Sequence, residues 1–467
     1  MPLRAKIMPG VLQTRREYAS STSIEGITKP VEGDDPEDVM FSSIYGLRTI
    51  ELNRPKKLNS LNGSMARKIM ATLNEWEKSE LANVVVIQGA GRAFCAGGDV
   101  AALANWNREG PEGSQRSADY FALEYKLDHF IAAYSKPYIA YMDGITMGGG
   151  VGLSIHAPFR IATENTVFAM PETTIGFFPD VGASFFLPKM DGSLGTYLAL
   201  TSEQLKGVDV FYHGLATHYI HSTSLPALSH RLSELQPKDY AGSREVHSLI
   251  ASTIAEFDTG LPSPRPQITG GQRQMIDGIF AADSPLDILA GLQDLINSGD
   301  HSQEIQQWAE KTIKTIKERS PTSVAVTLRQ MREAREWDIA ETFQRELDIA
   351  THFMHHPDFV EGVTARLINR TKERPNWSPN TLEEVTDEQV NAFFQRVGKE
   401  PLDLLETRNN GRYAEYPHAW LGLPTESQIR KLSSEGMSTE EIVKHFIKEK
   451  EGKVGVREKV EEVMERH

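Results

Sequence analysis

Two acidic residues in one largely apolar stretch are the first candidates for chemistry. Glu172 and Asp180 lie within residues 170–182 (MPETTIGFFPDVG), where proline and glycine bend the chain. Burial in such surroundings raises the pKa of a carboxyl group and makes it usable for acid–base work near neutral pH. The residues alone leave a second interpretation open, in which either side chain caps a helix.

Two glycine-rich turns offer a way to stabilise negative charge on an oxygen atom. Residues 96–99 (AGGD) and 148–150 (GGG) each follow a buried-strand pattern and lead into a predicted helix. Such turns expose backbone N–H groups, and two N–H groups from separate turns can converge on one oxyanion. Tight packing of strand against helix would also explain the glycines. The second turn lacks the third glycine of a dinucleotide fingerprint.

The usual catalytic motifs are missing from the sequence. It contains no G-x-S-x-G, H-E-x-x-H or G-x-x-x-x-G-K-[ST] pattern. We interpret Cys95 as a small buried side chain rather than a nucleophile. His355 and His356 are adjacent, so on a helix they point in different directions and make a poor metal pair. We expect surface or capping roles for His213, His218 and His221. The sequence therefore predicts neither a metal site nor a bound cofactor.

The elements that must position these residues follow a recurring order. Strand patterns cover residues 41–53, 83–88 and 138–142, and helical patterns cover residues 61–77 and 117–134. Strand, turn and helix recur without an exact repeat, which predicts an α/β fold. Beyond about Thr201 the chain becomes mostly helical. There Ser320 caps one helix, residues 337–353 form another, and residues 372–379 form a loop.

The composition fits a large soluble globular protein. The chain has 467 residues, of which 39% are hydrophobic and 24% charged. The formal net charge of −14 argues against binding nucleic acid through the protein's own field, although a peripheral place in a large assembly remains open. The single cysteine excludes an internal disulfide and indicates a reducing compartment. No apolar run approaches the roughly 20 residues that a membrane span needs.

We divide the chain into four parts. Residues 1–37 form a targeting or disordered segment, because Met1 to Ser20 is rich in arginine with a single acid, as in a mitochondrial presequence. The α/β core follows at 38–300 and a helical part at 301–400. The helical extension, 401–467, contains two capping boxes, Thr425-x-x-Gln428 and Ser438-x-x-Glu441. Its last stretch, from Lys448, is expected to be a solvated helix, with a docking element as the alternative.

Together these motifs resemble the crotonase (enoyl-CoA hydratase/isomerase) superfamily. Residues 53–61 (NRPKKLNSL) are similar to its opening motif, and residues 94–99 and 148–150 to its two oxyanion turns. The resemblance implies a crotonase-like spiral of β-β-α units, followed by a helical C-terminal region. Within the superfamily the chain most resembles the 3-hydroxyisobutyryl-CoA hydrolases, from about residue 39 to about 397.

The resemblance to the hydrolases rests on departures from the hydratase pattern. Hydratases carry a glutamate two residues after the glycine triplet, where this chain has Gly152. Their second glutamate is kept as Glu172, and Asp180 stands where hydratases have glycine. The resemblance also implies that Glu124 and Gly149 line the substrate pocket.

The same resemblance implies a mechanism without a serine or cysteine nucleophile. The thioester carbonyl of an acyl-CoA would accept from the N–H groups of Gly98 and Gly149. Glu172 would attack it or activate a water, while Asp180 and Glu124 orient the substrate. Coenzyme A, as part of the substrate, would lie over two turns that contain Lys56, Leu58, Ala96 and Asp99.

The extension after Pro401 keeps a second interpretation open. Some fungal proteins of the mitochondrial small ribosomal subunit resemble this hydrolase with added terminal segments, so the chain is either an enzyme of valine breakdown, a ribosomal subunit, or both. Both imply the mitochondrial matrix, and the second implies docking through the extension without sequence-specific contact to nucleic acid. Related cores often form homo-oligomers, but the helical region after Thr201 could cover that surface.

Overall fold

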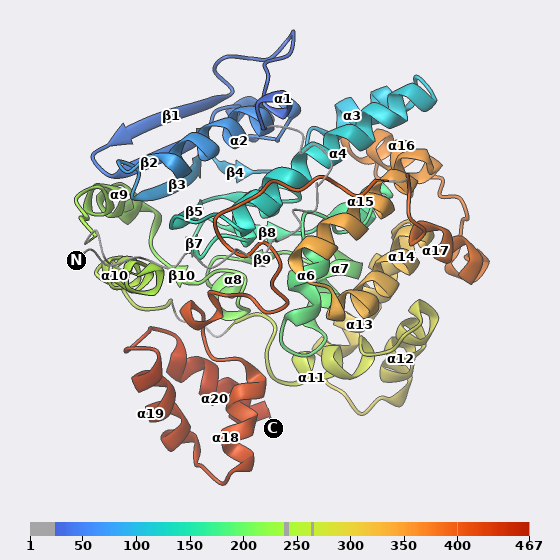
Figure 1. Ribbon diagram of the computed structural model, residues 1–467. Helices are drawn as coiled ribbons and strands as arrows, with labels where there is room; N and C mark the ends of the chain where they lie inside the picture. The colour runs from blue at the N-terminus through green and yellow to red at the C-terminus, as the bar shows by residue number, and fades with distance from the viewer. Residues whose placement is uncertain (1–23, 238–241, 263–265, 399, 467) are drawn as a thin grey trace, which may run out of the picture.

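The computed structural model describes residues 24–237, 242–262, 266–398 and 400–466, so most of the predicted targeting segment lies outside the described residues. Within that part of the chain, six strands form the larger sheet in the order β1-β2-β3-β5-β7-β10 (Figure 1). Its strands are β1 (Val39–Ile44), β2 (Leu47–Leu52), β3 (Val84–Gly89), β5 (Tyr138–Met142), β7 (Phe159–Ala162) and β10 (His218–Tyr219). Strand β1 pairs antiparallel with β2, and the other neighbours are parallel.

The single strand predicted over residues 41–53 is wrong. A turn at Tyr45-Gly46 divides it into the β1–β2 hairpin, with Tyr45 at a φ of 48°. The strands predicted at 83–88 and 138–142 are confirmed as β3 and β5. Their β-branched and aromatic runs are buried because helices cover a parallel sheet on both faces.

The smaller sheet carries the turns that matter for chemistry. Its strands, in the order β4-β6-β8-β9, are β4 (Ala93–Cys95), β6 (Ile145–Met147), β8 (Val167–Ala169) and β9 (Leu205–Lys206). Successive stretches of chain give one strand to each sheet and then a helix, which confirms the spiral of β-β-α units. Because β4 and β6 are parallel neighbours, their carboxyl ends bring the two glycine-rich turns together.

The first helices pack around these sheets. They are α1 (Ile24–Ile27), α2 (Gly63–Lys78), α3 (Val100–Asn107), α4 (Pro111–Ala132) and α5 (Gly149–Ile155). Helix α4 begins six residues before the predicted start, at Pro111. Proline is favoured at the first position of a helix, because the backbone N–H that it lacks would have no partner within the helix there.

The helical region continues from these units and folds back onto them. Its helices are α6 (Ala183–Phe186), α7 (Leu194–Thr201), α8 (Val208–Tyr212), α9 (Leu225–Ser233), α10 (Ser243–Ala255), α11 (Gly270–Ile279), α12 (Pro285–Ser298), α13 (Gln303–Glu318), α14 (Pro321–Glu333), α15 (Ile339–His355), α16 (Pro357–Val363) and α17 (Asp387–Phe393). The hydroxyl of Ser320 caps α14 as predicted. Helix α15 packs along α4, so residues far apart in sequence share one core.

The extension first forms a strap over residues 401–424 and then the C-terminal helical unit, α18 (Glu426–Ser434), α19 (Thr439–Glu449) and α20 (Val456–Arg466). Figure 1 shows this unit in red beside the core. Both predicted capping boxes are present. The expectation of a solvated helix is wrong for α20, because Val456, Val460 and Val463 are buried against the other two helices.

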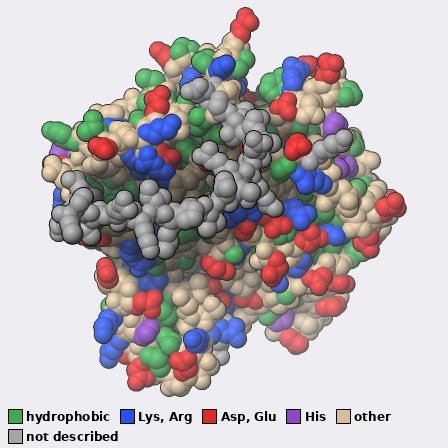
Figure 2. Space-filling view, viewed as in Figure 1, with side chains coloured by type: hydrophobic (Ala, Val, Ile, Leu, Met, Phe, Trp, Pro, Cys, Tyr) green, Lys and Arg blue, Asp and Glu red, His purple; other side chains and the backbone are tan. Residues whose placement is uncertain are grey.

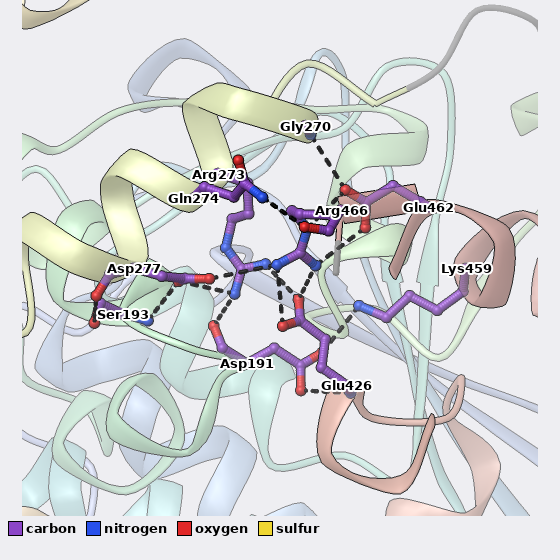
Figure 3. A network of polar contacts seen from close by, with 10 residues as sticks. All are labelled: Asp191, Ser193, Gly270, Arg273, Gln274, Asp277, Glu426, Lys459, Glu462 and Arg466. Carbon is purple, nitrogen blue, oxygen red and sulfur yellow. Dashed lines mark hydrogen bonds and ion pairs between the residues drawn. The ribbon is translucent and has the colours of Figure 1, made fainter. Parts of the chain in front are cut away.

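A buried network of charges fixes the C-terminal helical unit to the core (Figure 3). The Arg273 guanidinium on α11 pairs with Glu426 on α18, and Arg466 on α20 lies 2.6 Å from the same carboxylate. Lys459 reaches Asp191 of the core at 2.9 Å. Burial alone would raise the pKa of Glu426, but the hydrogen bond from Arg466 and attraction to Arg273 and Lys459 lower it to about 2. Among the described residues, no helix is both long and apolar enough to cross a membrane.

Candidate active site

The two oxyanion turns meet at Gly98 and Gly149. A Cβ atom built on Gly149 would collide with Oε1 of Glu124 and would lie 3.4 Å from the nitrogen of Gly98. Gly149 is the first residue of α5, so its N–H has no partner within the helix. Gly148, before it, has a φ of 46°, which favours glycine. The geometry places two backbone amides side by side, as an oxyanion hole requires.

Three carboxyl groups surround this turn, each from a different element. Glu124 comes from α4, Glu172 from the short helix η2 (Glu172–Ile175), and Asp180 from the turn before α6. Their exposed fractions are 2%, 5% and 4%. Oε1 of Glu172 would lie 3.1 Å from a Cβ atom on Gly148. The structure therefore brings the predicted site residues together.

The hydrogen bonds of these carboxyl groups are incomplete. The Tyr125 hydroxyl donates to Oδ2 of Asp180 at 2.7 Å. Oε1 of Glu124 and Oε2 of Glu172 are buried and find no hydrogen-bond partner in the described part of the chain. Buried polar atoms are nearly always paired, so two unpaired oxygens at one turn indicate groups that await a ligand or water.

Burial and mutual repulsion set the charge of the cluster. Burial, followed by repulsion from Asp180, raises the pKa of Glu124 and of Glu172 well above the usual range. Burial also raises the pKa of Asp180, to about 7, although the hydrogen bond from Tyr125 opposes it. The carboxyl groups thus titrate as a coupled cluster, in which each ionisation is opposed by burial and by the neighbouring negative charge.

A fourth carboxyl group, which the sequence reasoning missed, lies behind the site. Asp128 is fully buried, and a Cβ atom on Gly152 would lie 2.6 Å from its Oδ2. Glu124 and Asp128 stand four residues apart on α4 and face Gly149 and Gly152 on α5. The i, i+4 spacing of two acids on one predicted helix was the signal that could have revealed it.

Cys95 and the histidines take no part in this cluster. Cys95 is fully buried, and burial raises the pKa of its thiol to about 12, as fits a small packing residue. The expectation of a surface or capping role is wrong for His218, which is buried beside Thr217. His221 does cap a short helix. Across the described ranges, no group of three or more His, Cys, Asp or Glu side chains is placed to hold a metal ion.

The turns predicted to hold coenzyme A also meet. The N–H of Ala96 donates to the carbonyl of Leu58 at 3.0 Å. Asp99 pairs with Arg54 at 3.0 Å and with Lys57 at 3.1 Å, and these hydrogen bonds lower its pKa although burial opposes them. Lys56 is exposed on the same turn. Contact of these residues with coenzyme A stays a prediction.

Comparison with known proteins agrees with this geometry. A family model described as enoyl-CoA hydratase/isomerase matches residues 47–394. The chain is 52% identical over 471 residues to the small ribosomal subunit protein mS47 of Neurospora crassa, a match that covers 100% of this chain and 91% of that protein. It is 40% identical over 372 residues to the mitochondrial 3-hydroxyisobutyryl-CoA hydrolase of Gallus gallus, which covers 79% of this chain and 92% of that protein.

Solved structures show the same fold. A carnitinyl-CoA dehydratase from Mycobacterium thermoresistibile is similar with a TM-score of 0.67 and 32% identity, over 78% of this chain and 98% of that chain. The matched family region contains both oxyanion turns and all four buried carboxyl groups of the site. The chain therefore belongs to the enoyl-CoA hydratase/isomerase family.

Proposed function

We propose that this protein hydrolyses a short β-hydroxyacyl-CoA thioester, with 3-hydroxyisobutyryl-CoA as the first candidate substrate, in the mitochondrial matrix. The observation that carries the proposal is the set of three buried carboxyl groups, Glu124, Glu172 and Asp180, around two adjacent backbone amides, with one oxygen of Glu124 and one of Glu172 unpaired. The relatives named as 3-hydroxyisobutyryl-CoA hydrolases support the choice of acyl group.

Each group has a definite part in the proposed reaction. The N–H groups of Gly98 and Gly149 bind the thioester oxygen and stabilise its negative charge in the transition state. In one route Glu172, beside Gly148, attacks the carbonyl carbon, the C–S bond breaks to release the coenzyme A thiolate, and water then hydrolyses the mixed anhydride to the free acid and Glu172. In the other route Glu172 takes a proton from the water that attacks, and the tetrahedral intermediate expels the thiolate, which receives that proton. Glu124 and Asp180 hold the substrate hydroxyl or the water.

Gly152 makes hydration of an enoyl-CoA the weaker alternative. It has no side chain that could act as an acid or base, and the Asp128 carboxyl beside it lies behind the site. We expect release of the coenzyme A thiol from 3-hydroxyisobutyryl-CoA, followed with a disulfide dye, to be much faster than hydration of crotonyl-CoA. Efficient hydration without thiol release would contradict the proposal.

A different observation favours a second function, in which the chain is a protein component of the mitochondrial small ribosomal subunit. The relative named mS47 in Neurospora crassa matches the whole chain, strap and C-terminal helical unit included, whereas the hydrolase of Gallus gallus matches 79% of it. Acidic and basic side chains are interspersed on the face seen in Figure 2. We therefore infer that docking would depend on protein contacts rather than on a basic surface that attracts RNA.

Sedimentation separates the two functions. A ribosomal subunit would comigrate with mitochondrial small subunits on a sucrose gradient at physiological salt, and a free enzyme would stay in the upper fractions. Deleting residues 425–467 should abolish comigration if the C-terminal helical unit provides the docking surface. Comigration together with thiol release by the same fractions would establish both functions.

A further inference from the structure

The turn that carries Asp180 has a strained backbone. Within residues 179–184 (PDVGAS), Val181 has a φ of 54° and Gly182 a φ of 87°. A β-branched residue in the left-handed region is a genuine outlier. Such a conformation persists only where the surrounding structure holds it in place.

The core supplies part of that support. The Tyr125 hydroxyl binds the Asp180 carboxylate, and a ring nitrogen of His156 lies 2.9 Å from the carbonyl oxygen of Val181. A Cβ atom at Gly182 would collide with the His156 ring. These contacts come from α4 and from the end of α5, and the N–H of Ala183 donates to the Asp180 carbonyl within the turn, but the N–H groups of Gly182 and Ser184 still need a partner.

Two side chains from helices that follow the core in sequence complete the support. The Gln330 amide on α14 donates to the carbonyl of Pro179 at 2.7 Å and to the Ser184 hydroxyl at 2.5 Å. The Glu346 carboxylate on α15 accepts from the N–H of Gly182 at 2.7 Å and from the N–H of Ser184 at 2.9 Å. Both side chains are fully buried. They hold the turn on both sides of Asp180.

Glu346 is a costly residue for a merely structural position. A buried carboxyl group loses its hydration, and backbone N–H groups recover only part of that free energy. Leucine or methionine would fill the same space without this cost, but would leave two buried N–H groups without a partner. The carboxylate is explained by what it binds, because one rigid fork satisfies two amides of the same turn.

We propose that Gln330 and Glu346 are positioning residues, which hold Asp180 in its place beside Glu172 and Glu124 by fixing the 179–184 turn. This inference rests on the proposed function. Gln330 and Glu346 lie in the helical part after the core and touch no reacting atom, so this part of the chain would act in catalysis only through the turn that it holds.

The test compares two variants with a matched control in the full-length protein. Glu346→Gln keeps the size of the side chain but turns an N–H group toward one of the two amides, and Gln330→Leu removes both donated hydrogen bonds. The control is Glu341→Gln, the same change on α15 at a site that is 39% exposed and pairs with Arg345. Circular dichroism and gel filtration select folded protein.

We expect each folded variant to lose about 10- to 100-fold in kcat, because a displacement near 1 Å can cost that much, with KM changed by less than about threefold. The control should match wild type. Since both residues act through one turn, the double variant should be little slower than the slower single variant. Folded Glu346→Gln protein with wild-type kcat would overturn the inference.

A crystal structure of Glu346→Gln supplies a readout that does not depend on activity. We expect the turn to shift and the Tyr125–Asp180 hydrogen bond to break. An unchanged turn would overturn the inference even if the wild-type protein hydrolysed no acyl-CoA, and that inactivity would itself count only against the proposed function.

Discussion

At the scale of single residues, the chemistry of the site is governed by the small number of negative charges that its buried carboxyl groups can carry at once. Glu124, Glu172 and Asp180 are buried together, and in the described part of the chain no lysine or arginine is among the main causes of their pKa shifts. Each ionisation therefore hinders the next. In the proposed reaction, the amides of Gly98 and Gly149 are the groups that stabilise a developing negative charge on the substrate.

Exchanging the carboxyl groups one at a time should separate their roles. Glu172→Gln keeps the shape and removes the reactive group, so kcat should fall by at least about a thousandfold. Glu124→Gln should act mainly on KM, because Glu124 is assigned to substrate placement. Steady-state thiol release measures both. Cys95→Ser is the control and should stay within about tenfold of wild type; an inactive Cys95→Ser protein would instead indicate a cysteine thioesterase.

The pH profile should report the coupled cluster. We expect kcat/KM to rise with pH through an apparent pKa near 7, because Asp180 has a pKa of about 7 and one carboxyl group must ionise. Asp180→Asn removes a like charge beside Glu172, so the remaining activity should show an apparent pKa shifted toward acid. A profile that keeps its midpoint in this variant would exclude coupling between the two.

At the scale of elements, the sequence pattern predicted those helices and strands whose position depends on neighbouring residues alone. Strand β5 follows from its short apolar run, and α14 from the Ser320 cap and Pro321. The turn at Tyr45 escaped prediction because tyrosine carries no turn preference. Glu346 escaped it for another reason: its partner Gly182 is 164 residues away, and only the packing of α15 brings them together.

The attachment of the C-terminal helical unit can be tested at one side chain. Arg273 is 2% exposed, and Arg273→Met leaves Glu426 with one fewer partner in a buried network, which should cost about 3 to 5 kcal/mol. Urea unfolding and limited proteolysis of the unit measure the loss. The control Arg457→Met breaks pairs of surface side chains about half exposed, and should change stability by less than about 1 kcal/mol.

At the scale of the whole molecule, the strap joins the extension to the back of the site. The Gly411 carbonyl lies 2.8 Å from Nε2 of His129 on α4. The Tyr416 hydroxyl donates to the carbonyl of Ala157, next to the histidine that supports Val181. Residues beyond the matched family region thus pack against the helices that hold the proposed site.

Stability should depend on pH through the buried acids. Burial raises the pKa of Glu346 to about 8 and that of Asp180 to about 7, so the folded protein binds more protons than the unfolded chain over this range. Stability is then lost as pH rises through about 7 to 8. We expect Tm to increase by a few degrees between pH 8.5 and pH 6, and to increase less in Glu346→Gln. An equal increase in Tm in the wild-type protein and in Glu346→Gln would show that groups other than Glu346 cause the pH dependence.

The charge network of Figure 3 also has a consequence for the order of events during synthesis. Arg273 leaves the ribosome 153 residues before Glu426, its partner in the network. At about 5 to 20 residues per second, roughly 8 to 30 s separate the two residues, and until then Arg273 has only Asp277 and the Asp191 carbonyl as partners within the described part of the core. The last part of the chain to be made therefore completes a network whose other members are synthesised first.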